Sequence, residues 1–152
     1  MKQTPYDMQL EANLQKGVLC REGFLGTDHR KILEIIAADT GVVNKLGTSH
    51  EDIAAKLGKI LKQAMERYGN PVNVAENLVA VYREAMGRIP CPWPHCSLAP
   101  KGEVELVDTA GDRIFRFSPL SVHTIAMHGF YGGKGSRYRL EPKQLQEVLE
   151  RA

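Results

Sequence analysis

The chain has 152 residues, enough for one compact domain or for one domain with a small satellite module. Hydrophobic residues make up 43% of it, but no apolar run approaches the ~20 residues of a membrane-spanning helix. The net charge of +2 excludes a strong overall attraction to nucleic acid or anionic lipid, so any basic surface must be local. The polar N-terminus and three cysteines, an odd number, predict a cytoplasmic protein with thiols or metal ligands rather than disulfides.

The first ninety residues are predicted to be mainly helical. Apolar residues at four-residue spacing indicate a short amphipathic helix over about 6–16. Thr27 and Asp28 are typical N-cap residues, and they precede an apolar stripe that predicts a second helix. We expect this helix to be kinked at Gly41 and to end at Gly47, because glycine weakens a helix interior and commonly follows a helix end.

A third helix has the clearest apolar face of the chain. Thr48 and Glu51 match a capping box at its start, and a Gly-Asn-Pro sequence predicts its end. The next stretch, 72–87, fits either a helical stripe or a hairpin that pairs 72–74 with 78–82. Of the two, we favour a helix.

The second part of the chain begins with a proline-rich stretch at 90–96, which excludes a helix interior and marks a module boundary. Alternating residues over 103–108 and 113–117, on either side of a Thr-Ala-Gly-Asp turn, predict a hairpin. Ser118, followed by proline, is expected to cap the next helix, which ends at a glycine. Pro142 is expected to begin a short last helix.

Two pairs of candidate metal ligands lie in this second part: Cys91, Cys96, His123 and His128. The cysteines have C-x4-C spacing in the proline-rich loop, and the histidines have H-x4-H spacing on the helix after the hairpin. Zinc prefers thiolate and imidazole ligands, and four of them complete a tetrahedral structural site.

In ligand type, ligand order and histidine spacing, residues 91–129 resemble a zinc finger of the two-cysteine, two-histidine type. The resemblance implies a zinc ion that joins the helix to the hairpin, and contact with DNA. Between Cys96 and His123 lie 26 residues, against ~12 in the familiar pattern. We therefore expect zinc binding rather than the family's mode of reading the DNA groove.

Other interpretations of these residues remain open. The cysteines and histidines could simply pack in a core, and His95 could replace a ligand or contact one. A site with three ligands would keep a position open for water, and a zinc hydrolase could then use Asp108, Asp112 or Glu103 as general base. Cys20 stands alone and is interpreted as a small core residue.

The segment 129–139 follows the ligand helix and holds three basic residues, three aromatic residues, four glycines and no acidic residue. Basic side chains bind phosphate, and aromatic rings stack on bases. The candidate nucleic-acid contacts are Lys134, Arg137, Arg139, Tyr131 and Tyr138. The alternative is a glycine-rich turn in which Phe130 and Tyr131 pack against the zinc module and the charges are solvated.

The sequence thus predicts an α+β fold. A helical region, 1–89, packs on a zinc-binding module, 90–152, that contains two strands, a helix and a short C-terminal helix. The predicted function is binding rather than catalysis, with nucleic acid as the leading partner, contacted through 129–139 and a lysine stripe over 56–62. The alternatives are a scaffold that binds a protein partner or a second copy of itself, and a zinc hydrolase.

Overall fold

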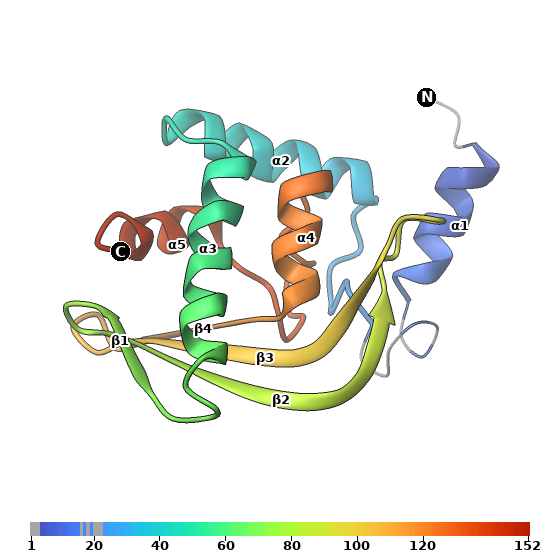
Figure 1. Cartoon of the computed structure of the whole chain (residues 1–152). Coiled ribbons are helices and arrows are strands. Elements are labelled where there is room, and N and C mark those ends of the chain that lie inside the picture. The colour runs from blue at the N-terminus through green and yellow to red at the C-terminus, as the bar shows by residue number, and fades with distance from the viewer. Residues whose placement is uncertain (1–3, 16, 18, 20–22) are drawn as a thin grey trace.

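The computed structural model describes residues 4–15, 17, 19 and 23–152, so the expectation for Cys20 lies outside the described residues. Three helices precede a four-stranded sheet, and two helices follow it (Figure 1). In chain order the elements are α1 (Pro5–Asn13), α2 (Ile32–Lys45), α3 (His50–Met65), β1 (Val72–Ala75), β2 (Leu78–Pro90), β3 (Leu98–Asp108), β4 (Arg113–Phe117), α4 (Pro119–His128) and α5 (Pro142–Leu149). The predicted α+β class is confirmed. None of the described helices has the length and apolar character needed to cross a membrane.

The sheet is an antiparallel meander in the order β1-β2-β3-β4. Leu78 pairs with Asp108 and Glu84 with Gly102, but the register of β2 and β3 shifts between Glu84 and Arg88. Four steps along β2 here oppose two along β3, and extra residues on one strand bend the pair and increase its twist. In Figure 1, β2 and β3 accordingly curve upward toward α1 at the end that leads into the proline-rich loop.

Residues 72–87 form β1 and most of β2, so the favoured helix prediction is wrong and the hairpin alternative is correct. The inward side chains of β2 alternate along the strand, with Leu78, Ala80 and Tyr82 buried. Asn77 adopts a left-handed φ of 57° in the turn, which asparagine tolerates better than most residues. Burial against α3 and pairing with β3 decide between two patterns that the local sequence fits equally well.

Two N-cap predictions are also wrong. Lys31 precedes α2 and supplies no side-chain cap, while Asp28 binds Arg30 and the backbone N–H of Lys134 instead. The α3 cap is Ser49, whose hydroxyl accepts a hydrogen bond from the N–H of Asp52, and not Thr48. Ser49 has the extended backbone of an N-cap residue, with φ −137° and ψ 161°, so its hydroxyl and not that of Thr48 reaches the first turn.

The predictions for the last two helices are confirmed. Ser118 caps α4 in a reciprocal capping box with Ser121, and Pro119 is the first helical residue. Gly129 ends α4 in the left-handed region at φ 65°, where a side chain would be strained. Pro142 begins α5. Local rules determine both ends of α4, and these ends position its two histidines.

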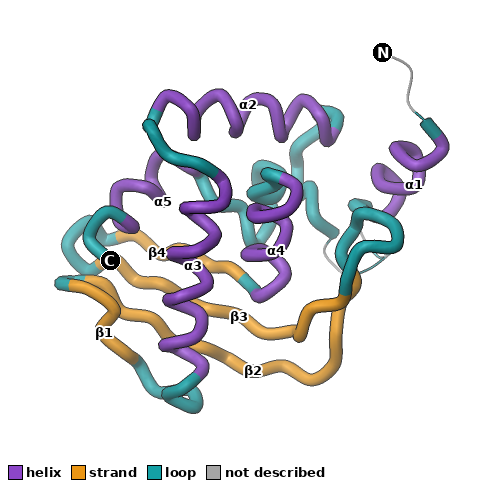
Figure 2. Tube along the Cα trace, turned by 45° about the horizontal axis from the view of Figure 1, so that its top comes forward, coloured by secondary structure: helices purple, strands orange, loops and turns teal. Residues whose placement is uncertain are grey.

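Two hydrophobic clusters hold the fold together. In the larger one, α3, α4 and α5 pack on one face of the sheet, with α3 and α4 lying across the strands (Figures 1 and 2). The smaller one joins α1 and α2 to the curved end of the hairpin, and its buried members are Leu10, Leu14, Ile32, Ile35, Cys91, Trp93, Ala99, Leu120 and Phe130. The smaller cluster contains one of the four candidate ligands, Cys91.

Candidate metal centre

Both cysteines lie in the loop that connects β2 to β3. Pro90 and Leu98 are the last paired residues of the two strands, and the N–H of Cys91 donates a 2.8 Å hydrogen bond to the carbonyl of Ser97. This bond closes the loop across its base. The prolines restrict the backbone between the cysteines, so Cys91 and Cys96 are held at opposite ends of a short, stiff connection.

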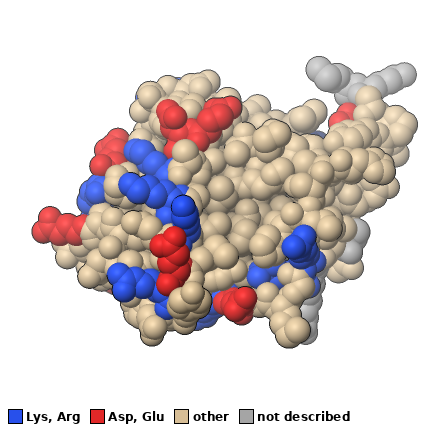
Figure 3. Space-filling model, in the orientation of Figure 1, with Lys and Arg blue, Asp and Glu red and all other residues tan. Residues whose placement is uncertain are grey.

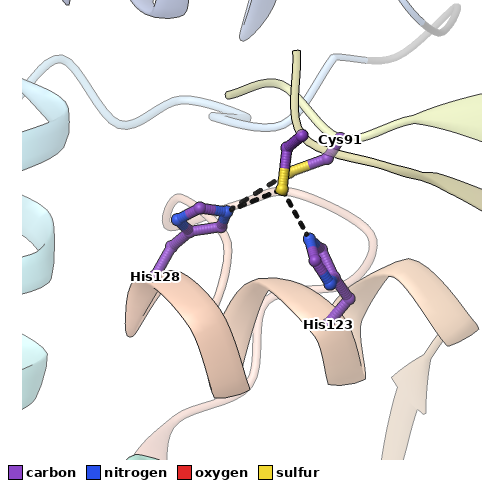
Figure 4. Close-up of side chains that lie close together, drawn as sticks. Cys91, His123 and His128 are labelled. Atoms are coloured by element: carbon purple, nitrogen blue, oxygen red, sulfur yellow. Dashed lines mark hydrogen bonds between the residues drawn. The ribbon is translucent and has the colours of Figure 1, made fainter. Parts of the chain in front are cut away.

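Both histidines lie on α4, which packs beside this loop. His128 is the last residue of the helix, and His123 lies five residues earlier. The two imidazole rings meet edge to face, with their centroids 5.5 Å apart. Figure 4 shows that His123 and His128 reach from the helix toward Cys91 on the opposite side of the site. Residues from two parts of the fold therefore converge on one point.

The distances between donor atoms fit a single metal ion. All four donor atoms lie within 4.8 Å of one another. Sγ of Cys96 is 3.2 Å from Nε2 of His123 and 3.6 Å from Nε2 of His128, and Sγ of Cys91 is 3.5 Å from Nε2 of His128. Zn–S and Zn–N bonds of ordinary length, set at a tetrahedral angle, place sulfur and nitrogen ~3.6 Å apart. The chain carries a candidate metal site of the two-cysteine, two-histidine type.

Burial shifts the pKa values of these ligands. It raises the pKa of the Cys91 thiol to about 12, and the neighbouring Cys96 adds to the effect. Burial lowers the pKa of His123, and it lowers that of His128 with a further contribution from the charge of His123. The imidazoles are therefore neutral at neutral pH, with a lone pair free to bind a metal, whereas the Cys91 thiol has to lose its proton as a metal binds.

Trp93 and Ser97 lie beside the ligands and contact them, and neither was predicted from the sequence as part of the site. The indole of Trp93 stacks on the imidazole of His128 with centroids 3.9 Å apart and planes at 1°, and Phe130 meets Trp93 edge to face. Oγ of Ser97 lies 3.2 Å from Nε2 of His123. A tryptophan between two prolines in a ligand loop was the available signal, because such a residue is positioned to pack on the ligands.

The structure does not bring the other candidate residues, His95 as a ligand and Asp108 or Glu103 as a general base, into the ligand cluster. His95 is exposed, with φ 60°, and it is not part of the ligand cluster. Asp108 ends β3 at the opposite end of the strand from Leu98, and it is bound there by Arg113 and Arg151. Glu103 is bound by Arg137. Neither carboxylate belongs to the ligand cluster, and each is held in an ion pair with arginine.

Two of the five candidate nucleic-acid contacts are buried inside the fold. The side chain of Arg139 is 8% exposed and binds Asp39 through two hydrogen bonds of 2.6 and 2.9 Å. Tyr131 is 2% exposed, and its hydroxyl lies 2.9 Å from Nδ1 of His50. The alternative prediction for this segment also needs correction, since its arginines form ion pairs and are not simply solvated.

The other three contacts reach the surface to different degrees. Lys134 is exposed, Tyr138 is partly buried, and the side chain of Arg137 is 49% exposed while it binds both carboxylate oxygens of Glu103. On the face drawn in Figure 3, basic and acidic side chains are interspersed. Binding to nucleic acid stays a prediction.

Comparison with models of protein families, with curated proteins and with solved structures gave no match. The ligand types and their order resemble a zinc finger, but the hairpin beside them belongs to a four-stranded sheet. The case for a metal therefore depends on the geometry of the four side chains.

Proposed function

We propose that this protein binds one zinc ion through Cys91, Cys96, His123 and His128, and that the metal is structural. The observation that carries the proposal is the set of sulfur-to-nitrogen distances, 3.2 to 3.6 Å, around one point between the loop and α4. Zinc prefers this combination of soft thiolates and imidazoles.

A structural role follows from the number of ligands and from their surroundings. Four protein ligands fill a tetrahedral zinc ion and leave no position for a reactive water. The metal would join the β2–β3 loop to the end of α4, beside the smaller hydrophobic cluster. A small cluster stabilises its surroundings weakly, and zinc supplies the additional free energy. We therefore propose a binding protein rather than an enzyme that acts at this metal.

The metal proposal is tested by elemental analysis of the purified protein and by Co²⁺ substitution. We expect one zinc per chain, and a Co²⁺ spectrum with the intense visible bands of a tetrahedral thiolate site. Cys96→Ser should abolish stoichiometric binding. Because Cys96 is exposed, its loss should leave the metal-free fold intact. Ser97→Ala, which removes a neighbouring hydroxyl, is the matched control and should retain the metal. A metal-replete preparation without bound zinc would refute the proposal.

Nucleic acid remains the proposed partner, now with a smaller set of contacts. Exposed Lys134 and the half-exposed side chain of Arg137 support it, because such groups attract phosphate. Fluorescence anisotropy with labelled single-stranded DNA and RNA is the test. Lys134→Gln should weaken binding and reduce its salt dependence, while Lys143→Gln on α5 serves as the control. Equal binding by both variants and the wild type would favour the alternative, a protein partner.

A further inference from the structure

A cavity of about 510 Å³ lies between the curved part of the β2–β3 hairpin, α4 and the segment after α4. The register shift between Glu84 and Arg88 lies at its rim, where the regular pairing of the two strands is interrupted. Bulges occur often beside binding sites, because they redirect side chains and end regular pairing. The volume is within the ~300–1,000 Å³ of typical small-molecule sites. None of the four candidate zinc ligands lines this cavity.

The wall of the cavity is mainly apolar. Leu120 and Ile125 of α4 contribute to it, and both are almost completely buried in the protein. Phe24, Ile89 and Leu140 add to the apolar lining from three other segments. A cavity with this lining favours a ligand whose body is hydrocarbon or aromatic, because transfer of such a body from water is favourable.

One hydroxyl of the lining has no hydrogen-bond partner in the part of the chain that the structure describes. Oγ of Ser136 is buried without a hydrogen-bond partner among the described residues. A buried hydroxyl without a partner is unfavourable, so rotation of the Ser136 side chain toward a ligand atom in the cavity would be stabilising. The hydroxyls of Ser118 and Ser121 differ, because they already bond to one another in the α4 capping box.

The charged groups of the lining favour an anionic ligand atom. Arg137 binds Glu103 through Nε and Nη2, and its side chain is still 49% exposed. Lys101 also lines the cavity, and it forms no ion pair with any residue that the structure describes. The first turn of α4 adds the positive end of a helix dipole at Ser118 and Leu120.

Glu84 at the rim and Glu103, which is paired with Arg137, oppose these charges, so a ligand with several negative charges would be repelled. We infer that the cavity binds a small molecule with an apolar body and a single carboxylate-like anionic head. The head lies at Ser136, Arg137 and Lys101, and the body lies against α4. This inference is independent of the zinc proposal and assigns a second, separate site.

The test uses the full-length protein as purified and two simple carboxylates, octanoate and 3-phenylpropionate. Each is titrated into ¹⁵N-labelled protein, and the amide shifts of Leu120 and Ser136 are followed by NMR. We expect saturable shifts of both amides with at least one carboxylate. Octan-1-ol, which has the same body as octanoate but no charge, should bind about tenfold more weakly or worse. Absence of saturable shifts with both carboxylates would overturn the inference, as would equal binding of octan-1-ol.

Three variants locate the binding. Ala85→Trp places a large ring at the exposed rim, and it should abolish the shifts without affecting zinc content or the circular dichroism spectrum. Ser136→Ala removes the unpartnered hydroxyl, and it should weaken carboxylate binding about three- to tenfold without loss of stability. Lys101→Gln should weaken the carboxylates but not octan-1-ol, while Lys143→Gln on α5 should change neither. Unchanged affinity in Ala85→Trp would show that the carboxylates bind elsewhere.

Discussion

The ion pair between Asp39 and Arg139 is the strongest candidate for a polar interaction that the fold depends on. Arg139 donates to both oxygens of Asp39, to the carbonyl of Gly132 and to the carboxylate of Glu141. The side chains of Asp39 and Arg139 are 6% and 8% exposed. The pair joins α2 to the segment after α4. Asp39→Asn keeps the shape of this contact and removes one charge.

We expect Asp39→Asn to lower the free energy of unfolding by ~3 kcal/mol. Breaking a buried ion pair by neutralising one partner costs ~3–5 kcal/mol, because the other charge stays buried. Glu141 remains bonded to Arg139 and offsets part of this loss. Its side chain is 45% exposed, so it offsets the loss only in part, and the expected loss lies at the lower end of the range but within it. Against a total stability of ~5–15 kcal/mol, such a loss is large.

The assay is urea unfolding of the zinc-loaded protein, followed by circular dichroism. With a slope of ~1–3 kcal/mol/M, the expected loss shifts the midpoint by ~1–3 M. Arg83→Gln is the control, because Arg83 pairs with Glu105 at the surface and is 58% exposed. The control should cost less than ~1 kcal/mol. The double variant Asp39→Asn, Arg139→Gln should be more stable than the sum of the single losses predicts, since neither charge is then buried alone.

A loss for Asp39→Asn no larger than that of the Arg83 control would refute this reasoning. It would mean that the charge of Arg139 is solvated and is not held by Asp39. Arg139 would then be available to a ligand, and its original assignment as a nucleic-acid contact would regain support. Additive losses in the double variant would also count against a coupled pair.

Three further predictions concern other parts of the molecule. Gly41→Ala should raise the free energy of unfolding by ~1 kcal/mol in urea, because α2 has open space at this position. Gly133→Ala should lower it by ~2 kcal/mol or more, because the added methyl group would overlap the backbone of Leu25. Stabilisation by both variants would contradict this packing. Zinc should change the emission of Trp93, the single tryptophan, because one ligand imidazole stacks on its indole, and an unchanged spectrum at one zinc per chain would argue against the site. A hydrogen bond from Arg151 lowers the pKa of Asp108 from 3.8 to about 2, so this carboxylate stabilises the fold above pH ~4 and loses that effect as pH falls toward 2. Acid titration of metal-free Asp108→Asn should therefore show less loss of stability in this range than the wild type.

The features that local sequence determined are those governed by a few adjacent residues. Ser118 and Pro119 begin α4 and Gly129 ends it, as predicted, because capping and the left-handed glycine depend on neighbouring backbone groups alone. The β3–β4 hairpin follows from alternation around its turn in the same way. Because His123 and His128 lie on that helix and the cysteines lie in a proline-rich loop, the candidate ligand set could be found before the fold was known.

Only the tertiary structure determined the features that depend on residues far apart in the sequence. Residues 72–87 fit a helix or a hairpin locally, and pairing with β3 selected strands. Nothing near Arg139 in the sequence shows that it would meet Asp39, a hundred residues away, so a basic residue in a glycine-rich segment resembled a phosphate contact. The cavity likewise exists only where a strand bulge, a helix and a loop come together. Burial and ion pairing are properties of the folded chain, whereas caps, turns and ligand spacing are already present in short stretches of its sequence.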